Sequence, residues 1–120
     1  MKAPPSISDH IPLKPVDYLV LMVLDRGDRH GYGIVQDVEL ESQGQVRLVP
    51  GNLYAVLRRL MDKGLIEQAA GQEPGARGKA RRYYGLTDFG RAVLVEEARR
   101  LRRLVARSEA QDLLGPAESG

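Results

Sequence analysis

Residues 50–64, PGNLYAVLRRLMDKG, contain the most regular hydrophobic pattern in this chain. The apolar residues fall at the i, i+3, i+4, i+7 and i+8 positions of a helix: Leu53, Val56, Leu57, Leu60 and Met61. Proline is favoured in a first helical turn and glycine just after a last one, so Pro50 and Gly64 fit the two ends. We therefore predict an amphipathic helix between them.

The opposite side of this helix has small and polar residues near its start and basic residues further along. It contains Gly51, Asn52, Ala55, Arg58, Arg59 and Asp62, with Tyr54 at its border. Small residues allow the backbone to approach a flat partner, asparagine can make a bidentate contact with adenine, and arginine can bind guanine or phosphate. This composition suits the DNA major groove. A merely solvated polar side is the alternative interpretation.

A β-hairpin is expected directly after this helix. Residues 65–70 and 81–86 can form its strands, and the glycine-rich segment 71–78 can form its tip. Positive charges occur at the tip and on the second strand, at Arg77, Lys79, Arg81 and Arg82. Such charges beside a DNA-contacting helix favour phosphate contact. A solvated turn or a basic localisation tag is the alternative.

Further helices are predicted on both sides of these elements. Residues 15–24 are apolar all around the helix axis, which indicates burial against the core and against a second subunit. A second helix is expected over residues 32–42, after a turn at residues 28–31. Thr87 can cap a last helix that extends to about residue 107.

The last predicted helix has an apolar seam. Its residues follow a spacing of 4, 3 and 4 positions: Leu94, Ala98, Leu101 and Val105. We expect this seam to pair with the same seam of a second subunit. Packing on residues 15–24 of the same chain is the alternative.

The expected fold is mainly α with a β-hairpin, a winged helix-turn-helix followed by a C-terminal dimerisation helix. We predict a mobile N-terminal arm over residues 1–14 and a winged helix DNA-binding domain over 15–87. The dimerisation helix is expected over 88–110 and a flexible tail over 111–120.

Charge and composition limit the function classes. Up to Pro74 there are eight Lys and Arg against ten Asp and Glu, a balance of −2, and from Gly75 onward ten against six, a balance of +4. A concentrated basic region is typical of nucleic-acid binding, although basic solvated helices also produce it. The chain has no cysteine, and its two histidines are isolated, so we expect no metal site, no cofactor and no catalytic site.

The apolar run Val16–Leu24 is shorter than the roughly 20 residues that a membrane span needs, and the N-terminus does not resemble a signal peptide. We therefore expect a cytoplasmic protein without membrane contact.

Three segments resemble the PadR family of transcriptional regulators. They are residues 30–34, HGYGI; residues 51–67, which include GNLYAVLRRL and KGLIE; and residues 82–91, RYYGLTDFGR. The resemblance covers about residues 15–107. It implies a dimeric repressor that binds double-stranded DNA, with the 50–64 helix in the major groove, the hairpin on the neighbouring backbone, and the C-terminal helix joining the subunits of a homodimer.

The residues expected to contact DNA come from the polar side of the 50–64 helix, from the basic hairpin and from the segments that resemble the family. They are Tyr32, Gly51, Asn52, Tyr54, Ala55, Arg58, Arg59, Arg77, Lys79 and Arg81. The alternative function is a winged-helix module that binds another protein and not DNA, which would have no need of the basic hairpin.

The sequence departs from the family pattern at two points. Pro50 stands where the family usually has a hydroxyl residue, which removes one phosphate contact. The resemblance also implies a small aromatic or hydrophobic effector, in some members held by tryptophan at the dimer interface, and this chain has no tryptophan. The identity of an effector does not follow from the sequence.

Overall fold

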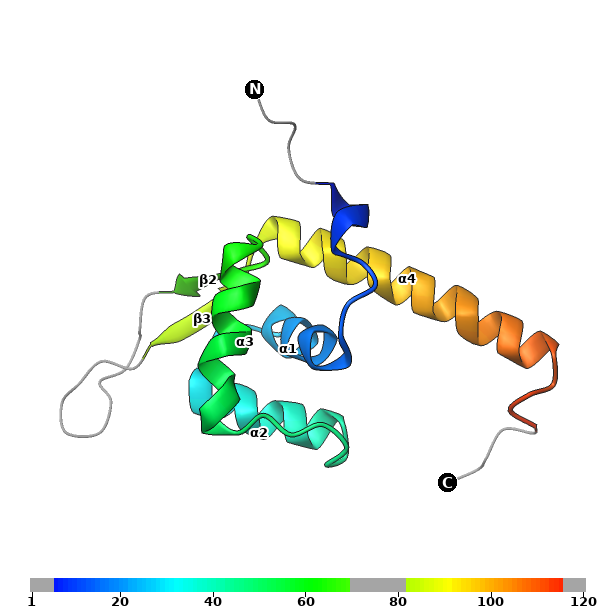
Figure 1. Ribbon diagram of the computed structural model, residues 1–120, viewed down its shortest axis with the longest axis horizontal. Coiled ribbons are helices and arrows are strands. Elements are labelled where there is room, and N and C mark those ends of the chain that lie inside the picture. Colours follow the sequence, from blue (N-terminus) through cyan, green and yellow to red (C-terminus); the bar gives the residue numbers. More distant parts are fainter. Residues whose placement is uncertain (1–5, 70–81, 116–120) are drawn as a thin grey trace.

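The computed structural model describes residues 6–69 and 82–115 (Figure 1). A short 3-10 helix, η1 (Ile7–His10), precedes α1 (Pro15–Asp25), β1 (Arg29–His30) and α2 (Gly31–Glu41). These are followed by α3 (Pro50–Asp62), β2 (Ile66–Ala69), β3 (Tyr83–Leu86) and α4 (Asp88–Ala110). The predicted fold class and the predicted helix after Pro50 are confirmed.

The strands form a three-stranded antiparallel sheet with β3 between β1 and β2. In the hairpin, Ile66 pairs with Leu86 and Ala69 with Tyr83. On the other side of β3, Arg29 pairs with Tyr84. The sequence predicted only a turn at β1, because a strand of two residues is too short to leave an alternating pattern.

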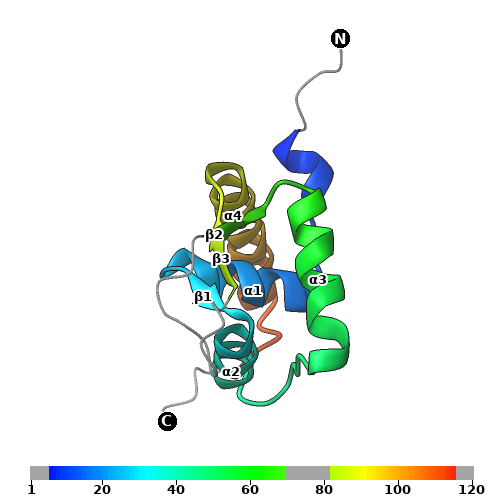
Figure 2. The same ribbon diagram turned by 90° about the vertical axis from the view of Figure 1, so that its left-hand side faces the viewer.

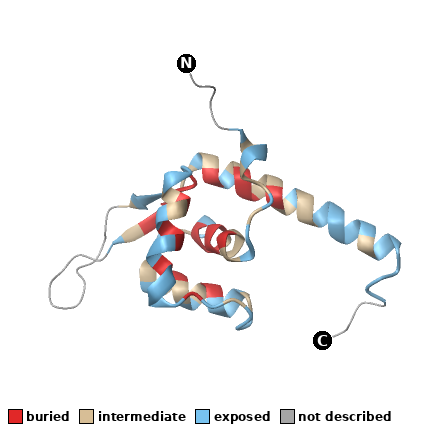
Figure 3. Ribbon diagram, viewed as in Figure 1, coloured by how far each residue is buried: buried red, intermediate tan, exposed pale blue. Residues whose placement is uncertain are grey.

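The core surrounds α1, which packs against α2, α4 and β3. Val20, Leu21, Val23 and Leu24 of α1 are buried, and the same helix is largely red in Figure 3. They pack with Ile34 of α2 in one hydrophobic cluster. The apolar residues Tyr18, Leu19 and Met22, on the other side of α1, are only partly buried.

Residues 6–14 pack on the fold, which differs from the mobile arm predicted for residues 1–14, of which residues 1–5 lie outside the described residues. The His10 and Phe89 rings meet edge to face with their centroids 5.3 Å apart, and Leu13 donates a backbone hydrogen bond of 2.7 Å to Glu97 Oε2. Both partners lie on α4, far away in sequence, and the segment has no helical or strand period that would indicate this packing.

Helix α4 extends well beyond the other elements (Figure 1). Its first half contributes Val93 and Leu94 to the core, whereas residues 102–107 are all exposed (Figure 3). Within residues 6–69 and 82–115, no helix is both long and apolar enough to cross a membrane.

Candidate nucleic-acid interface

Helix α3 lies along an outer side of the molecule, as the turned view shows (Figure 2). Its apolar side is buried, with Leu53, Val56, Leu57 and Leu60 in the core. On its other side, the structure leaves most of the predicted DNA-contacting residues of this helix exposed: Gly51, Asn52, Tyr54, Ala55 and Arg58. A surface helix with this polar side has the dimensions that fit a major groove.

Asn52 has a structural role at the start of α3. Its Oδ1 accepts a hydrogen bond of 2.9 Å from the backbone N–H of Val49. A bidentate contact with adenine needs both the oxygen and the amide nitrogen of an asparagine. One lone pair of this oxygen is therefore used at the start of the helix, while its second lone pair and the amide N–H donors carry the predicted contact with adenine.

The structure separates the two neighbouring arginines that the sequence placed on one face. Arg58 is exposed. Arg59 turns toward α1, where its Nη2 forms an ion pair with Asp17 Oδ1. The guanidinium of Arg59 is therefore held against α1, and its side chain is 33% exposed.

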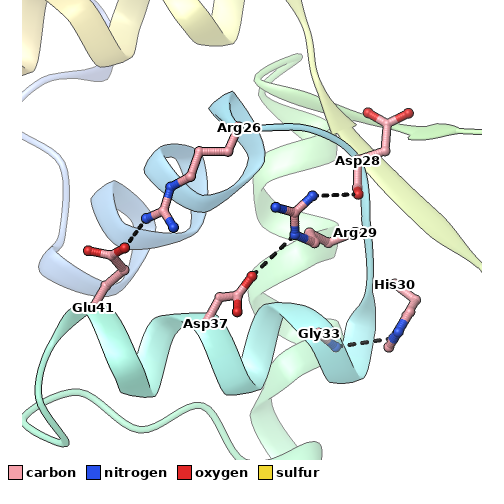
Figure 4. Close-up of polar contacts among 7 residues, drawn as sticks. All are labelled: Arg26, Asp28, Arg29, His30, Gly33, Asp37 and Glu41. Atoms are coloured by element: carbon pink, nitrogen blue, oxygen red, sulfur yellow. Dashed lines mark hydrogen bonds and ion pairs between the residues drawn. The ribbon is translucent and has the colours of Figure 1, made fainter.

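The start of α2 is fixed by polar contacts (Figure 4). His30 Nδ1 accepts a hydrogen bond of 3.1 Å from the backbone N–H of Gly33, which caps the helix. Arg29 Nε pairs with Asp37 at 3.2 Å, and Arg26 pairs with Glu41 near the end of the same helix. These contacts hold α2 at the orientation in which Tyr32, predicted to contact DNA, is exposed.

A cavity of about 490 Å³ opens between the start of α2, α3 and β3. It is lined by His30, Gly31, Tyr32, Tyr54, Arg82 and Tyr84. Burial raises the pKa of the Tyr84 hydroxyl, and nearby Tyr54 raises it further, against a smaller lowering effect of Arg82. Tyr84 is therefore a neutral hydrogen-bonding group near the base of the hairpin.

Three predicted hairpin contacts, Arg77, Lys79 and Arg81, lie outside the described residues. Arg82, the described basic residue that precedes β3, is exposed. In the part of the chain that the structure describes, no group of three His, Asp or Glu side chains could hold a metal ion.

The predicted seam on α4 is divided between two environments. Leu94 belongs to the core of its own domain and is only 6% exposed. Ala98 and Leu101 are half-buried, while Val105 is 50% exposed next to Leu104. Of the four seam residues, Val105 is therefore the exposed one, and Leu94 is part of the core.

Two acidic residues, Asp17 and Glu97, are buried. Neither is among the residues that the sequence predicted for DNA contact or dimerisation. Asp17 lies in the first turn of α1, and Glu97 lies within the buried half of α4. Hydrophobic periodicity gives no signal for a carboxylate that is buried because an arginine neutralises it.

A core of three helices followed by an antiparallel hairpin, with an exposed polar third helix, defines the winged helix-turn-helix class of proteins. The family model "Transcriptional regulator PadR-like family" matches residues 20–96. The chain belongs to this family of transcriptional regulators. It is thus a DNA-binding regulator and not an enzyme, which confirms the resemblance seen in the sequence.

Relatives and solved structures agree with this assignment. The transcriptional regulator Rv3488 of Mycobacterium tuberculosis is 36% identical over 86 residues, which cover 72% of this chain and 70% of that protein. A PadR family transcription regulator from Clostridium difficile superposes with a TM-score of 0.67 at 26% identity, covering 81% of this chain and 97% of the other. A PadR-like regulator from Bacillus cereus, at 23% identity and a TM-score of 0.64 over 84% and 93% of the two chains, shares the fold.

Proposed function

We propose that this chain is a homodimeric repressor that binds a palindromic operator in double-stranded DNA. The outer side of α3 enters the major groove, and the basic hairpin contacts the neighbouring phosphates. The observation that carries the proposal is the row of exposed small, polar and basic residues on α3, from Gly51 to Arg58. Because its target is the chromosome, the proposed activity is cytoplasmic.

The exposed half of α4 supports a dimer. Leu104 and Val105 are about half exposed, at 47% and 50%, on a helix that extends away from the core. Nearby, a cavity of about 420 Å³ with a largely apolar lining lies between α1 and α4, bordered by Leu13, Tyr18 and Leu101 among others. A second copy would cover this apolar surface. Two subunits would also supply the two recognition helices that a palindromic operator requires.

DNA binding is tested by titrating the protein with a duplex from the region upstream of its own coding sequence and with a random duplex, at two salt concentrations. We expect tighter binding to the upstream duplex and a steep loss of affinity with salt. Equal affinity for both duplexes would overturn sequence-specific binding. No binding to either would favour the alternative, a winged-helix module that binds protein.

The hairpin is tested with the double variant Arg77→Ala/Lys79→Ala. Both duplexes should be bound more weakly, and the salt slope should fall by about 0.9 for each phosphate that the variant no longer neutralises. The variant Arg103→Ala/Arg107→Ala, which removes the same charge from exposed sites on α4, should keep the slope. An unchanged salt slope in the hairpin variant would contradict phosphate contact by the hairpin.

Dimerisation is tested with Val105→Arg. Because Val105 is exposed, the change should leave the fold of the monomer intact. In the proposed interface, the same change would bury an unpaired cation. In sedimentation at micromolar concentration, the variant should be monomeric and should lose operator binding. Ala106→Arg adds the same charge at an exposed site off the seam and should stay dimeric. A dimeric Val105→Arg protein would move the interface elsewhere.

Repression is tested by transcription in vitro from the promoter that the protein binds, where added protein should reduce the transcript. An increase in transcript would make the protein an activator. The small-molecule effector that the family resemblance implies stays a prediction.

A further inference from the structure

Asp17 and Arg59 join the first turn of α1 to the DNA-facing helix α3. The carboxylate of Asp17 is 2% exposed, and Arg59 Nη2 binds it from 42 positions further along the chain. A carboxylate buried to this extent is strongly unfavourable unless a cation or hydrogen-bond donors neutralise it. Arg59 is the partner that makes the burial of Asp17 tolerable.

The rest of the Arg59 guanidinium is constrained as well. Its Nε is buried and has no hydrogen-bond partner among the residues that the structure describes. An unpaired buried N–H is costly, and an exposed conformation would allow water to satisfy it. The side chain nevertheless lies against α1, so its ion pair with Asp17 outweighs this cost.

The chain that leads into α1 is anchored from its other side. Leu13, four positions before Asp17, donates its backbone N–H to Glu97 Oε2 of α4 at 2.7 Å. Glu97 is itself held by two hydrogen bonds from Arg100, at 2.5 and 3.0 Å. The first turn of α1 is therefore fixed relative to α4, and Asp17 offers Arg59 a fixed point of attachment.

We propose that Arg59 is a positioning residue: with Asp17 it sets the rotation of α3 about its own axis, and it does not contact DNA. This inference rests on the proposed function, in which α3 contacts bases. Side chains on a helix lie about 5 Å from its axis, so a rotation of about 20° moves them by about 2 Å. A shift of this size breaks a hydrogen bond between Arg58 and a base edge.

A double-mutant cycle separates a positioning role from direct contact. The variants are Asp17→Asn, Arg59→Met and the double variant, measured for affinity to operator and to random duplex and for salt slope. Asparagine keeps the shape of aspartate, and methionine is an unbranched side chain without charge. Urea unfolding of each variant establishes that it is folded.

If Arg59 is a positioning residue, each single variant should lower the ratio of the affinity for operator to the affinity for random DNA by about tenfold. This is the discrimination that one bidentate base contact provides. The double variant should be no worse than either single variant, and the affinity for random DNA and the salt slope should be unchanged. A purely structural role would lower stability and leave the affinity ratio intact, which would overturn the proposal.

Direct DNA contact by Arg59 gives a different pattern. Arg59→Met would then reduce the salt slope by about 0.9 for a phosphate contact, or lower the operator affinity equally in the presence and absence of Asp17→Asn. Either result would overturn the inference. Arg58→Met, at the exposed neighbouring position, is the matched comparison: it should lower the affinity ratio without a loss of stability. Its effect should shrink in the Asp17→Asn background, where α3 no longer brings Arg58 to its base.

If Arg59→Met does not fold, Arg59→Lys replaces it in the same cycle, because lysine keeps the charge but not the planar guanidinium. The wild-type titration tests the proposed function separately: if the wild-type protein does not prefer its operator, the proposed function fails. If the wild type does prefer it but the cycle is additive, only the positioning role fails.

Discussion

The hydroxyl of Thr87 donates a hydrogen bond to the carbonyl oxygen of Gly64, with 2.6 Å between the two oxygens. The same hydroxyl accepts a hydrogen bond of 2.9 Å from the backbone N–H of Gly90 and so caps α4. One side chain thus connects the turn that follows α3 with the start of α4, the helix that extends away from the core.

Replacing Thr87 with Val should lower the free energy of unfolding by about 1–2 kcal/mol, because the variant keeps the shape of threonine but loses the cap. Urea unfolding measures this change. Thr87→Ser retains the hydroxyl and should lose much less. Equal stability of the Val variant and the wild type would show that the cap contributes nothing.

Gly90 should not tolerate a side chain. A Cβ at this position would lie 1.9 Å from the backbone carbonyl oxygen of Leu65 and 2.9 Å from Leu86 Cδ1. Gly90→Ala therefore forces α4 away from Leu65, the residue just before β2. We expect the free energy of unfolding to fall by an amount at or above the upper end of the roughly 1–3 kcal/mol typical of overpacking. Gly51→Ala is the control, since its Cβ would meet nothing within 4 Å. Thermal unfolding should show a lower melting temperature for the first variant only.

Substitutions of Asn52 can separate its role at the start of α3 from its proposed role on DNA. Asn52→Asp keeps an oxygen for the Val49 N–H, and a carboxylate near a helix N-terminus is favourable by about 0.3–1 kcal/mol. Its stability should equal or exceed that of the wild type. Operator binding should nevertheless fall sharply, because the N–H donors are replaced by a negative charge close to the phosphates.

Asn52→Ala loses both the hydrogen bond to Val49 and the donors, so it should be less stable by about 0.5–1 kcal/mol and should also bind the operator more weakly. Unfolding curves and operator titrations are to be measured on the same preparations. Normal operator affinity of the Asp variant would exclude Asn52 from the interface.

Glu97 should make stability depend on pH. The hydrogen bonds from Arg100 hold the pKa of this carboxyl below its usual value, and the Leu13 N–H acts in the same direction, while burial opposes them. Because the pKa is lower in the folded state, the ionised group stabilises the fold above its unfolded pKa. This stabilisation is lost as the pH falls through the folded pKa.

The variant Glu97→Gln should therefore be less stable than the wild type at pH 7, by about 1.5–3 kcal/mol for hydrogen bonds to a charged group. The difference should shrink as the pH is lowered from about 5, because protonation of the wild type then removes the same charge. Urea unfolding between pH 7 and pH 3 measures it. A difference that is constant across this range would contradict the assignment.

Local patterns explain which parts of the fold could be predicted from the sequence. The helix after Pro50 has its own periodicity and both end signals, and the hairpin has two strands around a glycine-rich segment, so each is specified by neighbouring residues. The ion pair between Asp17 and Arg59 joins residues 42 positions apart, and the hydrogen bond between Leu13 and Glu97 joins residues 84 positions apart. No local pattern contains such contacts.

The candidate site, like the fold, could be predicted only where neighbouring residues determine it. The outer side of α3 follows from its helical period, so the exposure of Tyr54, Ala55 and Arg58 could be anticipated. The helical period did not distinguish Arg58 from Arg59, because the difference comes from a buried acid on α1. Likewise, the engagement of Asn52 by the Val49 N–H is a detail of the backbone path into α3.

The continuity of α4 affects the geometry of the DNA that this protein would select. The helix runs from Asp88 to Ala110, and no glycine or proline follows Gly90 within it. Its first half is fixed in the domain core, so a dimer joined through its second half would have no hinge between the subunits. An insertion of about five base pairs between half-sites turns one of them to the opposite side of the duplex. A protein built in this way would reject such an operator and accept only sites in the correct rotational phase.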